Sequence, residues 1–167
     1  MKIKSFEELA KGIKEALDSP IEVKWNKLKS DWIGTFQTDK NEYNITIQEQ
    51  KYDIWKYKFF FVENDKLSIK MTNYNYDTFK VLATIYKSAF DFLDEVKPNG
   101  IIFGADNDSP NRVKLYTKFS NECVNKYGYT LYEASHGDKD INPTIYVLYH
   151  KLNPDELFEV IDSEVRI

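Results

Sequence analysis

The chain has 167 residues, 42% of them hydrophobic and 30% charged, and 23 basic against 27 acidic side chains give a net charge of −4. This length suits one domain with a sizeable core, and the composition excludes a disordered chain, a collagen, a coiled coil and a disulfide scaffold. Aromatic residues reach 16%, with 12 Tyr, so many rings can be half buried with their hydroxyl in water or on a partner.

Charge and metal-ligand content exclude two further classes. Arg112 and Arg166 are the only arginines, and an acidic chain without clustered cations does not suit nucleic-acid binding, which needs phosphate neutralisation. Cys123 is the only cysteine, so an internal disulfide and a cysteine-based zinc cage are excluded. The two histidines, His136 and His150, do not suffice for a multi-histidine site, and we expect no metal.

No apolar run approaches the roughly 18 residues of a membrane span. The first residues, MKIKSFEE, also lack the apolar stretch of a signal peptide. We therefore expect a cytoplasmic protein that does not bind membranes.

The first 72 residues predict a helix and an antiparallel meander. Ser5 and Glu8 form a capping box, and apolar residues at helical spacing predict a helix to about Asp18, before Pro20. Alternating or apolar runs then predict strands, and the Phe59–Phe61 run indicates a strand covered on both faces. The predicted strands cover residues 21–26, 32–36, 43–48, 54–62 and 67–71.

The periodicity then changes to alternate helices and strands. A helix is predicted from Asp77 or Thr78 to Val96, and the apolar strand Ile101–Phe103 is typical of parallel pairing. The remaining elements are a helix over 110–127, strands over 129–134 and 144–150, and a helix over 153–163. The sequence thus predicts one α/β (α+β) domain over 1–167, whose mixed, mostly antiparallel sheet is flanked by helices and whose β-α-β-α-β-β core covers 66–152.

The core resembles a known enzyme family at one motif. Ser109–Lys118, SPNRVKLYTK, followed by Tyr127-Gly128-Tyr129, is similar to the second conserved block of the GCN5-related N-acetyltransferase (GNAT) family. Tyr149–Leu152 is similar to the end of the family's last strand, and the resemblance covers the chain after residue 66. It implies a GNAT-like fold, acetyl-CoA as acyl donor, and Tyr116 as the tyrosine that protonates the departing thiolate.

The acyl-CoA loop departs from the family pattern. The family uses a glycine-rich loop, whose backbone N–H groups approach the pyrophosphate at a helix N-terminus. Here residues 71–79 read MTNYNYDTF, with neither a glycine nor a cation, and Asp77 would repel a phosphate. We therefore expect no cofactor, with acetyl-CoA retained only if the chain is an acyltransferase with an atypical donor site.

Each candidate site residue also has a structural interpretation. Tyr116 can instead pack on the apolar stripe of its helix, and Arg112, one turn earlier, can recognise an anion or pair with Asp108. Asp106, Asn107 and Ser109 follow a buried strand, where ligands bind in α/β sheets, but Asp108 or Ser109 can equally cap the next helix.

The remaining candidates lie in loops and on a helix. Asn73, Tyr74 and Asn75 form a polar-aromatic segment suited to recognition of a protein or sugar, or to a plain solvated connection. His136 with Asp138 or Asp140 invites a dyad interpretation but is better read as a loop tip. Cys123 should be an inert core thiol, and His150 structural.

The segments 78–85, 102–105 and 112–116 also resemble a group of small bacteriophage proteins, which would place the chain in the host cytoplasm. These features predict a GNAT-like phage protein that does not bind acetyl-CoA conventionally and acts by binding a protein partner. The alternatives are an active N-acyltransferase with an atypical donor site, and a virion or host-factor-interacting component.

Overall fold

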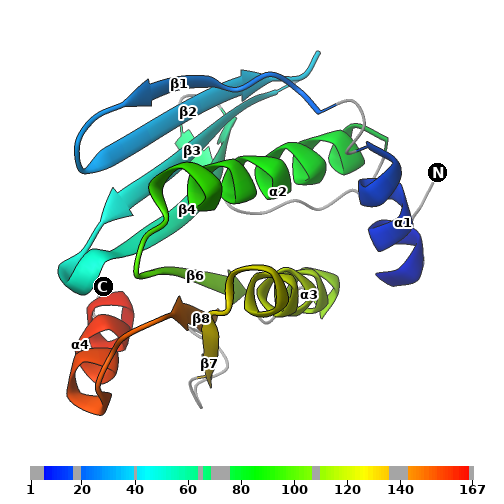
Figure 1. Cartoon of the computed structure of the whole chain (residues 1–167). Helices are drawn as coiled ribbons and strands as arrows, with labels where there is room; N and C mark the ends of the chain where they lie inside the picture. The colour runs from blue at the N-terminus through cyan, green and yellow to red at the C-terminus, as the bar shows by residue number, and fades with distance from the viewer. Residues whose placement is uncertain are drawn as a thin grey trace. The chain divides into compact units, whose positions relative to one another are not determined.

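The computed structural model describes residues 6–16, 20–39, 41–63, 66–68, 76–106, 110–135 and 143–165. These residues form four α-helices and eight β-strands (Figure 1). The strand pairing is mixed and mostly antiparallel, which confirms the predicted fold class. Contacts group the chain into two compact units, residues 1–48 with 57–97 and residues 49–56 with 98–167.

The first unit is built on an antiparallel meander, as predicted. Its strand order is β1-β2-β3-β4, and the short strand β5 pairs with β4. Strand β4 begins in the second unit and continues into the first from Tyr57. The elements of this unit are α1 (Phe6–Ala16), β1 (Lys24–Lys27), β2 (Asp31–Gln37), β3 (Glu42–Glu49), β4 (Ile54–Glu63), β5 (Lys66–Ser68) and α2 (Tyr76–Val96).

Period-two alternation explains the core of this unit. Every second residue of β2 and β3 is buried, and the Trp32 ring meets Phe92 of α2 edge to face, with centroids 5.2 Å apart. Lys27 covers the outer side of Trp32, 4.4 Å from the ring centroid, and pairs with Glu95 at 3.0 Å. The buried strand and helix side chains that form this core include Phe36, Tyr43, Ile45, Ile47, Tyr57, Phe59, Val81, Leu82, Ile85 and Phe92.

The prediction that the central strand is covered on both faces is confirmed at the start of β4 and is wrong at Lys58. Ile54 and Trp55 point to opposite faces and are both buried, so coverage is two-sided at the start of β4. From Tyr57 the pattern alternates, because Tyr57 and Phe59 are buried whereas Lys58 is exposed. Lys58 therefore lies on an open face of β4, on which the next described side chain, Phe60, is half-buried.

Gly12 places α1 against α2. A Cβ atom at this position would lie 2.5–2.6 Å from three carbons of the Phe79 ring, so only glycine fits without movement. The glycine that weakens the helix by about 1 kcal/mol relative to alanine therefore permits close packing between two helices.

Gly12→Ala is expected to lower the free energy of unfolding by about 1–2 kcal/mol. Overpacking against a stiff ring costs about 1–3 kcal/mol, which exceeds the helix-propensity gain of alanine. Urea denaturation followed by circular dichroism measures the change. The double variant Gly12→Ala/Phe79→Leu should recover part of the loss, and a higher midpoint for Gly12→Ala alone would contradict the packing argument.

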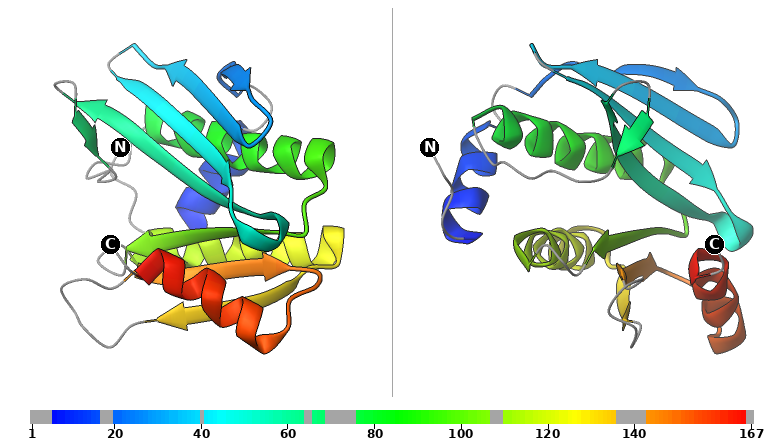
Figure 2. Two further views of the ribbon diagram at one scale, coloured as in Figure 1. Left: turned by 90° about the vertical axis from the view of Figure 1, so that its left-hand side faces the viewer. Right: turned by 180° about the vertical axis from the view of Figure 1, so that it is seen from behind.

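The second unit places helices on opposite faces of a four-strand sheet segment, ordered β4-β6-β8-β7 (Figure 2). Residues 54–56 of β4 pair in parallel with residues 100–102 of β6, and the other two ladders are antiparallel. The elements added here are β6 (Gly100–Asp106), α3 (Pro110–Tyr127), β7 (Thr130–Ser135), β8 (Pro143–Tyr149) and α4 (Pro154–Val165).

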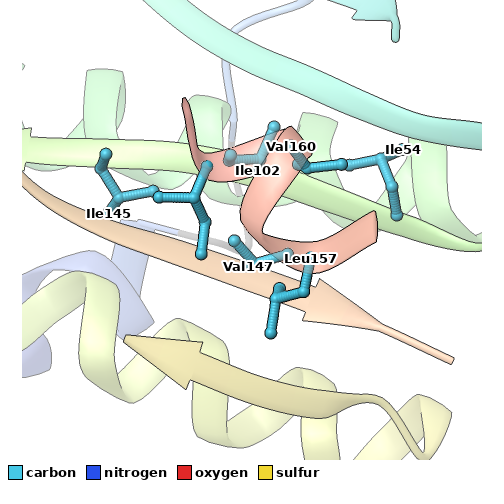
Figure 3. Packing of buried hydrophobic residues seen from close by; sticks show 7 residues of the cluster. Ile54, Ile102, Ile145, Val147, Leu157 and Val160 are labelled. Atoms are coloured by element: carbon cyan, nitrogen blue, oxygen red, sulfur yellow. The ribbon is translucent and has the colours of Figure 1, made fainter. Parts of the chain in front are cut away.

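The core under α4 joins residues far apart in the chain (Figure 3). Leu157, Val160 and Ile161 from α4 pack on one face of the strands, against Ile54 of β4 and the cluster members from β6 and β8. Those strand members are Ile102, Ile145 and Val147. Helix α3 covers the opposite face, where Phe103 and Tyr146 point.

Local signals at helix ends explain where α3 and α4 begin and end. Gly128 has φ +75° and donates its N–H to the Val124 carbonyl at 3.0 Å, which confirms the predicted end of α3. Asn153 and Glu156 exchange two side-chain-to-backbone hydrogen bonds of 3.0 and 2.9 Å, a capping box at the start of α4. α4 continues to Val165, two residues beyond its predicted end.

Candidate functional site

Tyr116, the candidate catalytic residue, lies on the face of α3 that packs against the strands. Its half-buried ring meets Phe103 of β6 nearly perpendicularly, with centroids 5.5 Å apart, and Tyr146 of β8 at 6.3 Å. Phe119, one turn later, meets Phe103 at 5.6 Å. We call Phe103, Tyr116, Phe119 and Tyr146 the α3 aromatic cluster. Phe103 and Tyr146 stack with centroids 5.2 Å apart, and the other ring pairs meet edge to face, a geometry that favours attraction between rings.

Tyr146 fixes α3 to β8 through its hydroxyl. Its side chain is fully buried, and its hydroxyl donates to the Val113 carbonyl at 3.2 Å and lies 3.1 Å from the Thr117 hydroxyl. Burial raises the pKa of Tyr146, so the phenol is neutral and satisfied within the fold. The sequence offered no signal for this pair, because Thr117 and Tyr146 are 29 residues apart.

The other predicted site residues on this side of the unit are placed only in part. Asp106 is the last residue of β6, in register with Pro143, and Arg112 lies in the first turn of α3, one turn before Tyr116. Asn107 and Ser109 lie outside the described residues, as do Asn73, Tyr74 and Asn75. The structure therefore brings the backbone of Asp106 and Arg112 to the end of the unit where β6 leads into α3.

A polar cluster around Asn99 was missed by sequence analysis, which assigned no functional role to the residues between the helix that ends at Val96 and the strand Ile101–Phe103. The Asn99 amide nitrogen donates to the carbonyls of Tyr52 and Lys151, both at 2.9 Å, and its oxygen accepts from the Lys151 N–H at 2.9 Å. The Asn99 N–H also donates to the Asp53 carboxylate at 3.0 Å. We call these contacts the Asn99 clasp.

The clasp holds a turn with unfavourable backbone geometry. Tyr52 and Asp53 have φ values of 64° and 55°, a left-handed conformation that costs side-chain-bearing residues about 1–3 kcal/mol each. Asp53 fixes the turn further by accepting from the Trp55 indole nitrogen at 2.8 Å. Tyr129 holds the residue just before Asn99, because its hydroxyl donates to the Pro98 carbonyl at 2.9 Å. The Tyr129 ring also stacks on His150, with ring centroids 4.0 Å apart.

Asn99→Ala is expected to lower the free energy of unfolding by about 2–3 kcal/mol. It removes three side-chain hydrogen bonds, each worth about 1 kcal/mol, and leaves the strained turn less well held. Thermal and urea denaturation measure the loss. Asn125→Ala, an exposed α3 position, should change stability by less than about 0.5 kcal/mol. A small loss of stability in Asn99→Ala would show that the turn at Tyr52 and Asp53 keeps its conformation without the Asn99 hydrogen bonds.

The turn also contacts α4 through its polar side. Lys51 pairs with Glu159, and the Tyr52 hydroxyl donates to the same carboxylate. These hydrogen bonds lower the pKa of Glu159, and the bond to Glu159 raises the pKa of Tyr52. Deeper in the unit, Lys56 and Glu164 form an ion pair at 2.9 Å with side chains only 20% and 12% exposed.

The remaining candidates have structural environments or are not described. Cys123 is fully buried, which confirms its place in the core, and His150 stacks on Tyr129. His136, Asp138 and Asp140 lie outside the described residues. Within the described ranges, no group of three or more His, Cys, Asp or Glu side chains is arranged to hold a metal ion. No helix in the same part of the chain has the length and apolar character required to cross a membrane.

Comparisons of this chain with protein-family models, with curated proteins and with solved structures each gave no match.

Proposed function

We propose that this chain is a GNAT-like binding protein that acts by contacting another protein and does not transfer acyl groups. The observation that carries the proposal is the environment of Tyr116. Its ring is a member of the α3 aromatic cluster, perpendicular to Phe103 at 5.5 Å, so packing within the fold accounts for an aromatic side chain at this position.

The start of α2 supports the same proposal. An acyl-CoA diphosphate needs close backbone N–H groups and a positive helix N-terminus. Asp77 is the second residue of α2, and a carboxylate there opposes a bound phosphate. The preceding residues, 71–75, contain neither the glycine that permits close approach nor a cation that would offset this charge.

The alternative, an N-acyltransferase with an atypical donor site, has one observation in its favour. Tyr116 is half buried, and it lies on the helix that directly follows β6. A tyrosine in that environment can reach a leaving group if a donor binds beside it. The third possibility, a virion or host-factor-interacting component, would also act through a binding surface, and it differs from the proposed function only in the identity of the partner.

Calorimetry with acetyl-CoA, combined with an acyl-transfer assay on primary amines, tests the proposal. We expect no binding in the micromolar range and no transfer above the uncatalysed rate. Micromolar binding, together with transfer that falls at least about tenfold in Tyr116→Phe, would overturn it. Tyr127→Phe on the same helix is the matched control, and it should leave any transfer unchanged.

A further inference from the structure

The second unit ends in an edge strand, β7, that carries neither Lys nor Pro. Among the described strands β7 has one partner, β8, with six register pairs from Thr130 to Ser135. Exposed edges are usually shortened or carry Pro or charged residues, especially Lys, which discourage pairing with another chain. The edge strand β1 follows this rule, with four residues and a lysine at each end. Strand β7 reads TLYEAS, and its one charged residue, the exposed Glu133, is acidic and so disfavours an acidic rather than a basic partner.

One face of this edge is partly apolar. Ala134 packs against the cluster under α4, and Tyr132, two residues earlier, points to the same face of the sheet. Tyr132 is opposite Val147, a member of that cluster, yet its side chain is 37% exposed. The α4 side of β7 therefore offers an aromatic ring beside the open strand.

Helix α4 adds a second aromatic ring on the same side. Glu156 and Glu159 are on the flank of α4 near Tyr52, toward β4, whereas Phe158 lies on the other flank, toward β7. At 56% exposed, Phe158 is the most exposed large hydrophobic side chain among the described residues.

Two carboxylates bracket this ring. Asp155 and Asp162 are three residues before and four residues after Phe158, the spacings that make neighbours on a helix surface, and both are exposed. α4 contains no basic residue in its sequence PDELFEVIDSEV, so nothing on the helix offsets these charges. The surface formed by β7, Tyr132, Phe158, Asp155 and Asp162 is therefore an apolar strip with an acidic rim; we call it the β7 edge surface.

We propose that the β7 edge surface binds an extended, basic segment of a partner protein, which pairs with β7 as an additional strand. Strand addition supplies main-chain hydrogen bonds, while side chains at alternate positions give specificity. Apolar residues of the segment contact Tyr132 and Phe158, and its Lys or Arg residues pair with Asp155 and Asp162. This inference rests on the proposed binding function and names its surface and the chemistry of its partner.

A second copy of this chain is a poorer occupant. Antiparallel pairing of two β7 strands about a two-fold axis perpendicular to the sheet would place both α4 helices on the same side. The carboxylates of Asp155 and Asp162 would then lie on the same side as their copies, and like charges across an interface disfavour association.

Selection from a displayed library of random peptides, with the full chain as bait, tests the inference. We expect enriched peptides that alternate apolar with Lys or Arg residues. A synthetic peptide from the selection should slow amide hydrogen exchange at Leu131–Ala134. Phe158→Ala and the double variant Asp155→Asn/Asp162→Asn should each weaken binding by at least about tenfold, and salt should weaken binding to the parent chain.

Leu28→Ala is the matched control, because Leu28 is 53% exposed in the first unit and should not affect binding. Peptides that bind but protect other amides, or whose affinity is unaffected by Phe158→Ala, would overturn the inference while leaving a binding function intact. If sedimentation shows a dimer that Phe158→Ala disrupts, the occupant of the β7 edge surface is a second copy of this chain and not a partner segment. Failure of the proposed function itself would appear separately, as acetyl-CoA binding with acyl transfer.

Discussion

Gly100→Ala is expected to lower the free energy of unfolding by more than about 3 kcal/mol. Gly100 begins β6 and is paired on both sides, with Ile54 of β4 and Tyr149 of β8. A Cβ atom there would lie 2.1 Å from the Leu148 carbonyl oxygen and 3.0 Å from the Tyr149 Cα, both backbone atoms. Because two ladders fix these atoms, the strands must separate to admit the methyl group.

Urea denaturation of Gly100→Ala, followed by circular dichroism, measures this loss. Gly128→Ala is an informative control, because a Cβ atom at Gly128 meets nothing within 4 Å, while φ +75° still disfavours alanine. That variant should lose only about 1 kcal/mol. Equal losses for the two variants would show that backbone conformation, rather than steric contact, limits Gly100.

The Cys123 thiol is expected to react about a thousandfold more slowly in the folded protein than an ordinary exposed thiol at pH 8. Burial is the main cause that raises its pKa from 9.0 to about 12, and the neighbouring Glu122 raises it further. Since the thiolate is the nucleophile, a shift of that size lowers its population at pH 8 about a thousandfold. Steric exclusion of the reagent by the core adds to this effect.

Absorbance during reaction with a disulfide reagent measures the rate, in buffer and again in urea, where reaction should become fast. A matched reference is Asn125→Cys in a Cys123→Ser background, which places a thiol on an exposed position of the same helix. If Cys123 reacts as quickly as that reference under native conditions, α3 must open frequently and the core assignment is wrong.

Local patterns were sufficient to predict the order and type of the elements. Period-two alternation around Ile45, the Gly128 signal and the Asn153 cap each depend on residues close in sequence, and each is found in the structure. Boundaries were less accurate at β1, which begins at Lys24 rather than near Ile21. There, alternation continues through residues that precede the paired strand.

Long-range contacts could not be predicted in the same way. The Asn99 clasp joins residues 46 to 52 positions apart, and no spacing rule connects an asparagine before a strand with the turn at Tyr52. The packing role of Gly12 could not be predicted either, because the approach of Phe79 is visible only in the folded chain. The candidate site was predicted as separate residues, and Tyr116 alone has a described side-chain environment.

The interleaving of the two units has a consequence for synthesis on the ribosome. The core under α4 needs Ile54 from the middle of the chain and Leu157, Val160 and Ile161 from its last helix. Residues 49–56 therefore emerge about a hundred residues before their partners, whereas every segment of the first unit has been translated by Lys97. The nascent chain must carry Ile54 without its final cover from α4, so this short stretch is where a co-translational chaperone would find exposed apolar surface.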